Sequence, residues 1–310
     1  MKTKAPIFID PIFNGAADPM IIKNEQDGTF FMFYTQRRAT AAFEGSVSYC
    51  YGSKIGVAQS TDNGREWFYR GALDLDFEFG DNTFWAPEIV WDKSSNKYHM
   101  FVTYIRGIHD TWSGDASIQH YISDDLLYWD RIGKVEIDST RVIDPCLYQL
   151  DDGTWRMWYK DERDGAHTYY ADSSNLYDWK EAGQATFDFA QEGPNVFKFG
   201  DKYWLVACEW SGQGVYSSTD LTAFTRQDGA RLLSDVSSRK MDGAVGRHVD
   251  VYTCDDRAFI VYFVHYNDSM DKEADTTVSH APTVVQIAEL HIKDGKLVCD
   301  RNEDFEINLT

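Results

Sequence analysis

The chain has 310 residues, of which 43% are hydrophobic and 15% aromatic, so it can bury a large core and lacks the composition of a disordered protein. Its 50 acidic and 30 basic residues give a formal charge of −20, which argues against nucleic acid or an anionic membrane as a partner. The five cysteines lack metal-site spacing and are expected to be reduced core residues. The first six residues lack the apolar stretch of a signal peptide, so a cytoplasmic location is predicted, or a periplasmic or secreted one if a signal has been removed.

Five segments along the chain share one pattern, in which an apolar strand and a polar turn are followed by a strongly aromatic strand. Each segment predicts a β-hairpin, because the turns are rich in Asp, Asn and Gly. The segments cover residues 20–35, 89–105, 147–160, 196–209 and 249–266.

A second signature follows four of the hairpins, namely a serine-led polar turn and then an aromatic residue. These aromatics are Trp67, Trp129, Trp179 and Phe224, and their spacings of 62, 50 and 45 residues match a four-stranded propeller blade plus a variable loop. The sequence therefore predicts an all-β fold, a single-domain five-bladed β-propeller over residues 1–310. The blades are expected to start near residues 18, 87, 144, 193 and 248, and residues 6–9 are expected to help close the ring.

Four longer polar stretches interrupt the repeat, and long loops in a compact domain are usually functional. They are predicted to include loops that overhang a pocket at one end of the propeller. These stretches are residues 36–54, 106–117, 229–246 and 267–282.

Three carboxylates, Asp18, Asp144 and Glu192, stand near the start of the first strand in the first, third and fourth units. The innermost strands of a propeller surround its channel, so these side chains are expected to converge although they are far apart in sequence. Glycoside hydrolysis needs a protonated and an ionised carboxyl group, and a third carboxylate nearby raises the pKa of the acid. Any one of them alone would be read as a turn residue.

Four short motifs, in order on successive repeats, resemble the five-bladed glycosidases of glycoside hydrolase family 43 and close relatives such as family 117. The resemblance spans about residues 10 to 266 and implies an inverting mechanism. In that mechanism Asp18 is the general base, Glu192 is the general acid, and Asp144 tunes and orients Glu192. The motifs are Ala17-Asp18-Pro19, Trp85-Ala86-Pro87-Glu88, Ile143-Asp144-Pro145 and Glu192-Gly193-Pro194.

Other residues are predicted to bind the substrate, an oligosaccharide. Trp85 and the neighbouring Phe84 are candidates for stacking on sugar rings, or could instead serve blade packing, and Trp112 and Trp210 are further candidates for stacking. Glu88 belongs to the second motif. Arg37, with Arg38 next to it, could bind an acidic or sulfated sugar or could neutralise carboxylates in the wall of the site, and the second role is preferred. The oligomeric state is left open.

His248 begins the fifth hairpin and looks like the histidine that faces the channel in the resembled family. In several members that histidine helps to hold a calcium ion or a water cluster. The spacing of a lone histidine predicts no metal site, so no cofactor is expected to be required. His248 is counted among the substrate-binding residues, with the orientation of site groups or water as its preferred role. A structural calcium ion in the channel, held by His248 through water, is the open alternative.

The preferred function is an exo-acting arabinofuranosidase-like or xylosidase-like hydrolase. A galactose- or anhydrogalactose-releasing enzyme, like those of family 117, is the first alternative, although the N-terminal helical extension of that family is missing. A retaining fructose-releasing enzyme would carry Arg-Asp-Pro where Ile143-Asp144-Pro145 stands, and a family 130 phosphorylase would not be expected to carry Glu192-Gly193-Pro194. A non-catalytic carbohydrate-binding propeller is the alternative from another class.

Overall fold

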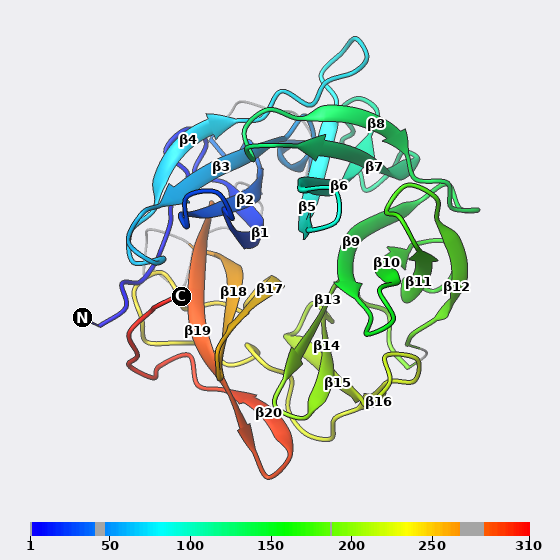
Figure 1. The fold of residues 1–310 in the computed structure, drawn as a ribbon. Helices are drawn as coiled ribbons and strands as arrows, with labels where there is room; N and C mark the ends of the chain where they lie inside the picture. Colours follow the sequence, from blue (N-terminus) through cyan, green and yellow to red (C-terminus); the bar gives the residue numbers. More distant parts are fainter. Residues whose placement is uncertain (1, 41–46, 187, 267–281) are drawn as a thin grey trace.

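The computed structural model describes residues 2–40, 47–186, 188–266 and 282–310. Its strands form five antiparallel sheets of four strands each, arranged around a central axis (Figure 1). Within the described residues the single helical element is a 3₁₀ turn at Ser48–Cys50, and no helix there is long and apolar enough to cross a membrane. The predicted all-β, five-bladed propeller is confirmed.

Each blade is built from four consecutive strands, and the first strand lies nearest the axis (Figure 1). Blade 1 contains β1 (Ala16–Lys23), β2 (Phe30–Gln36), β3 (Lys54–Ser60) and β4 (Phe68–Ala72). Blade 2 contains β5 (Thr83–Asp92), β6 (Lys97–Ile105), β7 (Ala116–Ser123) and β8 (Asp130–Lys134). Blade 3 contains β9 (Val142–Gln149), β10 (Trp155–Asp161), β11 (His167–Ser173) and β12 (Lys180–Gln184). Blade 4 contains β13 (Glu192–Phe199), β14 (Lys202–Cys208), β15 (Gln213–Ser218) and β16 (Thr225–Arg226). Blade 5 contains β17 (Arg247–Cys254), β18 (Arg257–His265), β19 (Thr283–Lys293) and β20 (Lys296–Cys299).

The burial of the strands follows their distance from the axis. The second strand of blade 1, β2, is buried at every residue, whereas the rim strands β4 and β8 are largely exposed. The inner strands are covered on both faces by the neighbouring blades, which explains their nearly continuous apolar and aromatic sequences. The core accordingly lies between blades: Met20 and Phe33 of blade 1 belong to one cluster with Ile89 and Met100 of blade 2.

The serine-led turns that mark the repeat are held by hydrogen bonds of one kind. In each turn the serine hydroxyl oxygen accepts a backbone N–H three or four residues later, and in three of them the indole N–H of the tryptophan donates to a carbonyl three residues earlier. The serines are Ser60, Ser123, Ser173 and Ser218, and the tryptophans are Trp67, Trp129 and Trp179. The signature recurs because the same turn is stabilised in the same way in successive blades.

Segments from both ends of the chain contact blades 1 and 5, which lie side by side (Figure 1). The N–H of Ile7 donates to the carbonyl of Val285 in β19 at 3.0 Å, and the N–H of Val285 donates to the carbonyl of Phe8 at 3.0 Å. Ile307 and Leu309 pack into the core between the two blades. Residues 6–9 therefore contact the fifth blade, as predicted, while each sheet is made of its own consecutive strands.

Every innermost strand is irregular at the same position, because its register with the second strand shifts there. One residue at each shift has a positive φ, a conformation that is uncommon outside glycine and that clusters at functional sites. These residues are Asp18 (47°), Ala86 (45°), Asp144 (59°), Gly193 (57°) and His248 (29°). The five bulges place equivalent residues of the five blades around one point on the axis.

Two residues beyond each bulge lies a residue that faces the central channel, and we call these five the channel ring: Met20, Glu88, Cys146, Asn195 and Asp250. Four of them accept a backbone N–H from the next blade. Glu88 accepts from Leu147 at 2.9 Å, Cys146 from Val196 at 3.2 Å, Asn195 from Val251 at 3.1 Å and Asp250 from Ile21 at 2.8 Å. The channel ring therefore joins neighbouring blades at four of the five junctions around the axis.

Candidate active site

A cavity of about 500 Å³ contains all three of the carboxylates predicted to be catalytic, and a cavity of this volume suits a small ligand. Asp18 comes from β1, Asp144 from β9 and Glu192 from β13. Asp18 and Asp144 are the bulge residues of their strands, and Glu192 immediately precedes its bulge residue. The cavity is lined by Asp18, Arg37, Tyr49, Cys50, Trp85, Trp112, Ile143, Asp144, Lys160, Glu162, Glu192, Trp210, Arg247, His248, Phe263 and His265.

Asp18 is buried next to two basic side chains. Its Oδ1 lies 3.4 Å from Nη2 of Arg37 and 3.5 Å from Nδ1 of His248. Burial by itself raises the pKa of Asp18, but the charges of Arg37 and His248 and a hydrogen bond with Thr35 hold this pKa below its ordinary value. Asp18 is therefore ionised at neutral pH, as a general base must be.

Asp144 is also buried, but its environment favours the protonated form. Burial raises the pKa of Asp144 to about 6, and the nearby Glu192 carboxylate adds to the rise while His248 and Lys160 oppose it. The N–H of Gly193 donates to Oδ2 of Asp144 at 3.0 Å, and the N–H of Asp144 donates to Thr103 at 3.0 Å. Asp144 therefore holds its proton to a higher pH than an exposed aspartate does.

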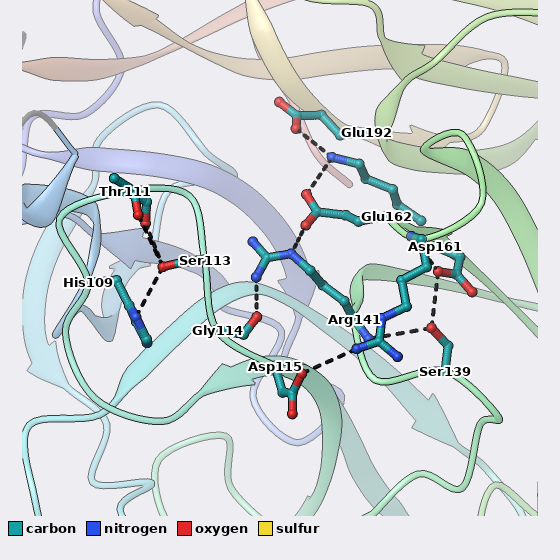
Figure 2. A network of polar contacts seen from close by, with 12 residues as sticks. His109, Thr111, Ser113, Gly114, Asp115, Ser139, Arg141, Asp161, Glu162 and Glu192 are labelled. Carbon is teal, nitrogen blue, oxygen red and sulfur yellow. Dashed lines mark hydrogen bonds and ion pairs between the residues drawn. The ribbon is translucent and has the colours of Figure 1, made fainter.

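Glu192 is held by a chain of ion pairs that continues through Glu162 to Arg141 (Figure 2). Its Oε2 lies 3.3 Å from Nζ of Lys160, which lies 2.9 Å from Oε1 of Glu162. Glu162 in turn pairs with Arg141, which also donates to the carbonyl of Gly114. Because the side chain of Lys160 is only 5% exposed, these partners fix its position and, through it, that of Glu192.

Lys160 and Glu162 were not among the residues predicted from the sequence. Lys160 pairs with Ile143 in the register of β10 with β9, and the equivalent positions of blades 1 and 2 hold Thr35 and Thr103. A lysine near the end of an otherwise buried, aromatic strand was the signal that could have revealed it. The free-energy cost of burying the ammonium group of Lys160 is offset by its ion pairs with Glu162 and Glu192.

Two tryptophans predicted to stack on sugar line the cavity with different exposure. Trp85 is 8% exposed, and its indole N–H donates to the carbonyl of Cys50 at 2.7 Å. Trp112 is 61% exposed and meets the Trp85 ring edge-on at a centroid distance of 6.0 Å. Trp210, which follows β14, is 42% exposed, and the centroid of its ring lies 5.6 Å from Nζ of Lys160. Phe84, in contrast, is buried in the core between blades 1 and 2, so it is a packing residue.

Of the other residues predicted to bind substrate, Arg37 and His248 line the cavity and Glu88 does not. Glu88 is two residues beyond the bulge, so it belongs to the channel ring, where it accepts the N–H of Leu147. Its contact with substrate stays a prediction that this position does not support. Arg37 pairs with Asp18, in agreement with the preferred neutralising role. Arg38 donates to the carbonyls of Ser48 and Tyr51 and so holds the loop after β2. Residues 41–46 and 267–281 of the predicted overhanging loops lie outside the described residues.

The donors around the channel do not form a recognisable metal site. Among the residues that the structure describes, no group of three or more His, Cys, Asp or Glu side chains has a suitable arrangement. The two oxygens of Asp250 accept hydrogen bonds from Ile21 and Asn195, and Nδ1 of His248 lies closest to Asp18. The described residues therefore offer no set of three direct ligands for the calcium ion, and His248 as a ligand through water stays a prediction.

Comparisons with known proteins agree with this geometry. A family model described as a probable glycosyl hydrolase domain, related to family 43, matches residues 10–248. The chain is 28% identical over 220 residues to a probable arabinan endo-1,5-alpha-L-arabinosidase A of Emericella nidulans, covering 66% of this chain and 62% of that protein. It is 26% identical over 202 residues to arabinan endo-1,5-alpha-L-arabinosidase A of Aspergillus niger, covering 61% and 56%. The matched region thus spans about 60% of the length of these relatives.

Solved structures show the same fold at lower sequence identity. A thermostable family 43 glycoside hydrolase aligns with a TM-score of 0.69 and 21% identity over 96% of both chains. A family 43 beta 1,3 galactosidase aligns with a TM-score of 0.72 and 12% identity over 98% of this chain and all of the other. An exo-1,5-alpha-L-arabinanase from a bovine ruminal metagenomic library aligns with a TM-score of 0.65 and 14% identity, over 94% and 99%.

Proposed function

The chain belongs to the family of probable glycosyl hydrolase domains related to glycoside hydrolase family 43, and we propose on this basis that it is an inverting, exo-acting glycosidase. One observation carries the proposal: a single cavity brings together Asp18, Asp144 and Glu192, and within it the lowered pKa of Asp18 favours the ionised state while the raised pKa of Asp144 favours the protonated state. Glycoside hydrolysis requires one carboxyl group in each of these two states.

In the proposed reaction, Asp18 accepts a proton from a water molecule as the water oxygen attacks the anomeric carbon. The bond from that carbon to the leaving oxygen breaks at the same time, and Glu192 donates its proton to this oxygen. The products are the free sugar with inverted configuration and the shortened oligosaccharide. Asp18 then releases its proton to solvent and Glu192 regains one, which restores the starting state.

The surrounding residues set these protonation states and positions. Arg37 interacts electrostatically with both Asp18 and Glu192, so it holds Asp18 ionised and supports the negative charge that Glu192 acquires. Burial, and with it the nearby Glu192 carboxylate, raises the pKa of Asp144, and Lys160 holds the Glu192 carboxylate in place. These contacts give Asp144 and Lys160 positioning roles.

We propose a terminal arabinofuranose or xylose residue as the sugar released. The names of the curated relatives, arabinan endo-1,5-alpha-L-arabinosidases, support an arabinose-containing substrate. Exo action is proposed because the cavity has a limited volume and is lined by Trp112 of the β6–β7 loop and Trp210 after β14. Incubation with linear arabino-oligosaccharides distinguishes the two modes, because an exo enzyme releases monosaccharide from the start and an endo enzyme releases shorter oligomers.

A panel of aryl glycosides tests the proposal, with Asp18→Asn and Glu192→Gln as variants. We expect each variant to lose about 10²–10⁴-fold in kcat on 4-nitrophenyl substrates. The loss in Glu192→Gln should be much smaller with a 2,4-dinitrophenyl leaving group, which departs without protonation, whereas Asp18→Asn should be impaired on both.

Asp201→Asn, in the exposed β13–β14 turn, is the matched control and should keep full activity. Proton NMR of the first product should show inversion of the anomeric configuration. Undiminished hydrolysis in Asp18→Asn or Glu192→Gln, or a retained configuration, would contradict the mechanism. Binding of oligosaccharides without hydrolysis of any substrate would identify a non-catalytic propeller.

A further inference from the structure

Arg247 lines the catalytic cavity but has no place in the proposed mechanism. It is the first residue of β17 and immediately precedes the bulge residue His248. This is the position that Glu192 holds in β13 and Trp85 in β5, and both of those side chains also line the cavity. The repeat therefore places a half-buried guanidinium at a position from which other blades supply site residues.

The other cationic side chains of the cavity wall have carboxylate partners. Arg37 pairs with Asp18, and Lys160 pairs with both Glu162 and Glu192. Arg247, in contrast, makes no hydrogen bond or ion pair through its side chain with any residue in the described part of the chain. A partly desolvated guanidinium is stable mainly when an anion is available to it, so the missing partner is expected to come from a ligand.

The local charge permits an anionic ligand even though the chain carries a formal charge of −20. The cavity wall holds four carboxyl groups, Asp18, Asp144, Glu162 and Glu192, against Arg37, Lys160 and Arg247. Arg141 supplies a fourth positive charge behind Glu162, so the four carboxyl groups are matched by four positive charges even when all of them are ionised. The cavity is therefore not negative overall, and the charge of Arg247 is the one that no carboxylate among the described residues offsets by direct contact.

We propose that Arg247 binds the oxyanion of an acidic sugar, a carboxylate or a sulfate ester, in the substrate that occupies the catalytic cavity. This inference rests on the proposed glycosidase function and names a substrate class for it. The planar guanidinium can donate two parallel N–H bonds to either kind of oxyanion, whereas neutral hydroxyl groups do not supply the missing charge. The inference thus adds an acidic sugar to the arabinose- or xylose-containing substrate proposed above.

Binding of free sugars tests the inference separately from catalysis. The probes are D-galacturonate, D-glucuronate and D-galactose 6-sulfate, each compared with its neutral parent sugar by isothermal titration calorimetry and by inhibition of aryl glycoside hydrolysis. We expect at least one acidic sugar to bind the wild-type protein at least about tenfold more tightly than its parent, the equivalent of about 1.4 kcal/mol. Arg247→Gln should abolish this preference, and Arg247→Lys should retain part of it because a point charge replaces the bidentate donor.

Arg65→Gln is the matched control, since Arg65 is exposed and does not line the cavity, and it should leave the preference unchanged. A preference for uronates alone assigns the subsite to a carboxylate, and a preference for the sulfated sugar alone assigns it to a sulfate ester. Equal binding of all acidic and neutral pairs, or a preference that survives in Arg247→Gln, would overturn the proposal. Hydrolysis of neutral aryl glycosides by the wild-type protein tests the glycosidase function independently of these results.

Discussion

Replacing Asp144 by Asn should make the protein more stable above pH 6 while it impairs catalysis. The carboxyl of Asp144 has a pKa of about 6 in the folded protein, chiefly because it is buried, against an ordinary value of 3.8. The folded state thus holds this proton more tightly than the unfolded state does. Stability is consequently lost as the pH rises from about 4 through 6, because ionising the buried carboxyl is costly.

The size of the effect follows from the two pKa values. A difference of about 2 in pKa, at about 1.4 kcal/mol for each tenfold change, gives about 3 kcal/mol. The asparagine side chain of the variant cannot ionise, and its amide oxygen can still accept the N–H of Gly193. The free energy of unfolding of Asp144→Asn, relative to wild type, should therefore increase by about 2.4 kcal/mol between pH 4 and pH 7, because a small part of the effect is already present at pH 4.

Urea unfolding at pH 4, 5, 6 and 7 measures this change, and the difference between the pH values cancels any constant effect of the substitution on packing. In a Glu192→Gln background the increase should be smaller, because the Glu192 carboxylate contributes to the raised pKa. Asp201→Asn, at an exposed position, serves as the control for ordinary surface titration. A stability difference between Asp144→Asn and wild type that does not change with pH would refute the reasoning.

Three further predictions concern binding, metal dependence and packing. Trp112→Ala should raise KM about three- to tenfold with a smaller change in kcat, because an exposed stacking surface is lost; an unchanged KM on every oligosaccharide would refute a role in binding. Dialysis against EDTA should leave the hydrolysis rate unchanged, since the described residues offer no ligand set for a metal, and activity restored only by Ca²⁺ would contradict this. Arg301→Met should cost about 3–5 kcal/mol in urea unfolding, because it leaves the fully buried Asp242 without its ion partner. Arg163→Met, which breaks an exposed pair with Asp115, should cost less than about 1 kcal/mol, and equal losses would argue against the role of burial.

The fold could be predicted from the sequence because the repeat is local. The hairpin turns and the turns that lead to Trp67, Trp129 and Trp179 are each stabilised within a few residues, so their signals survive in a linear reading. The convergence of Asp18, Asp144 and Glu192 could then be predicted, because each stands near the start of the innermost strand of its blade. A linear reading could not separate Glu192 from Glu88, because one residue precedes its bulge and the other follows, and only the register shift sends them to different places.

The residues that the sequence reading missed depend on contacts between distant parts of the chain. Lys160 is a site residue because Glu162 and Glu192 meet it from two directions, and its own strand reads as an ordinary buried aromatic strand. Arg247 is a candidate site residue because no carboxylate among the described residues pairs with it, and a pattern of residue types in the sequence cannot predict that. Arg247 becomes visible when the five innermost strands are aligned on their bulges, and Lys160 becomes visible when the second strands are aligned by their register with the innermost ones.

The channel ring also bears on how freely the blades can vary. At each of its four hydrogen-bonded junctions the donor is a main-chain amide, and only the acceptor comes from a side chain. An amide is present whatever residue occupies the donor position, so substitutions there leave the bond intact as long as proline is avoided. The acceptor position tolerates a carboxyl, a thiol and a carboxamide in turn, as Glu88, Cys146 and Asn195 illustrate. The ring can therefore persist while each blade diverges, which frees the neighbouring cavity positions to change the sugar that is recognised.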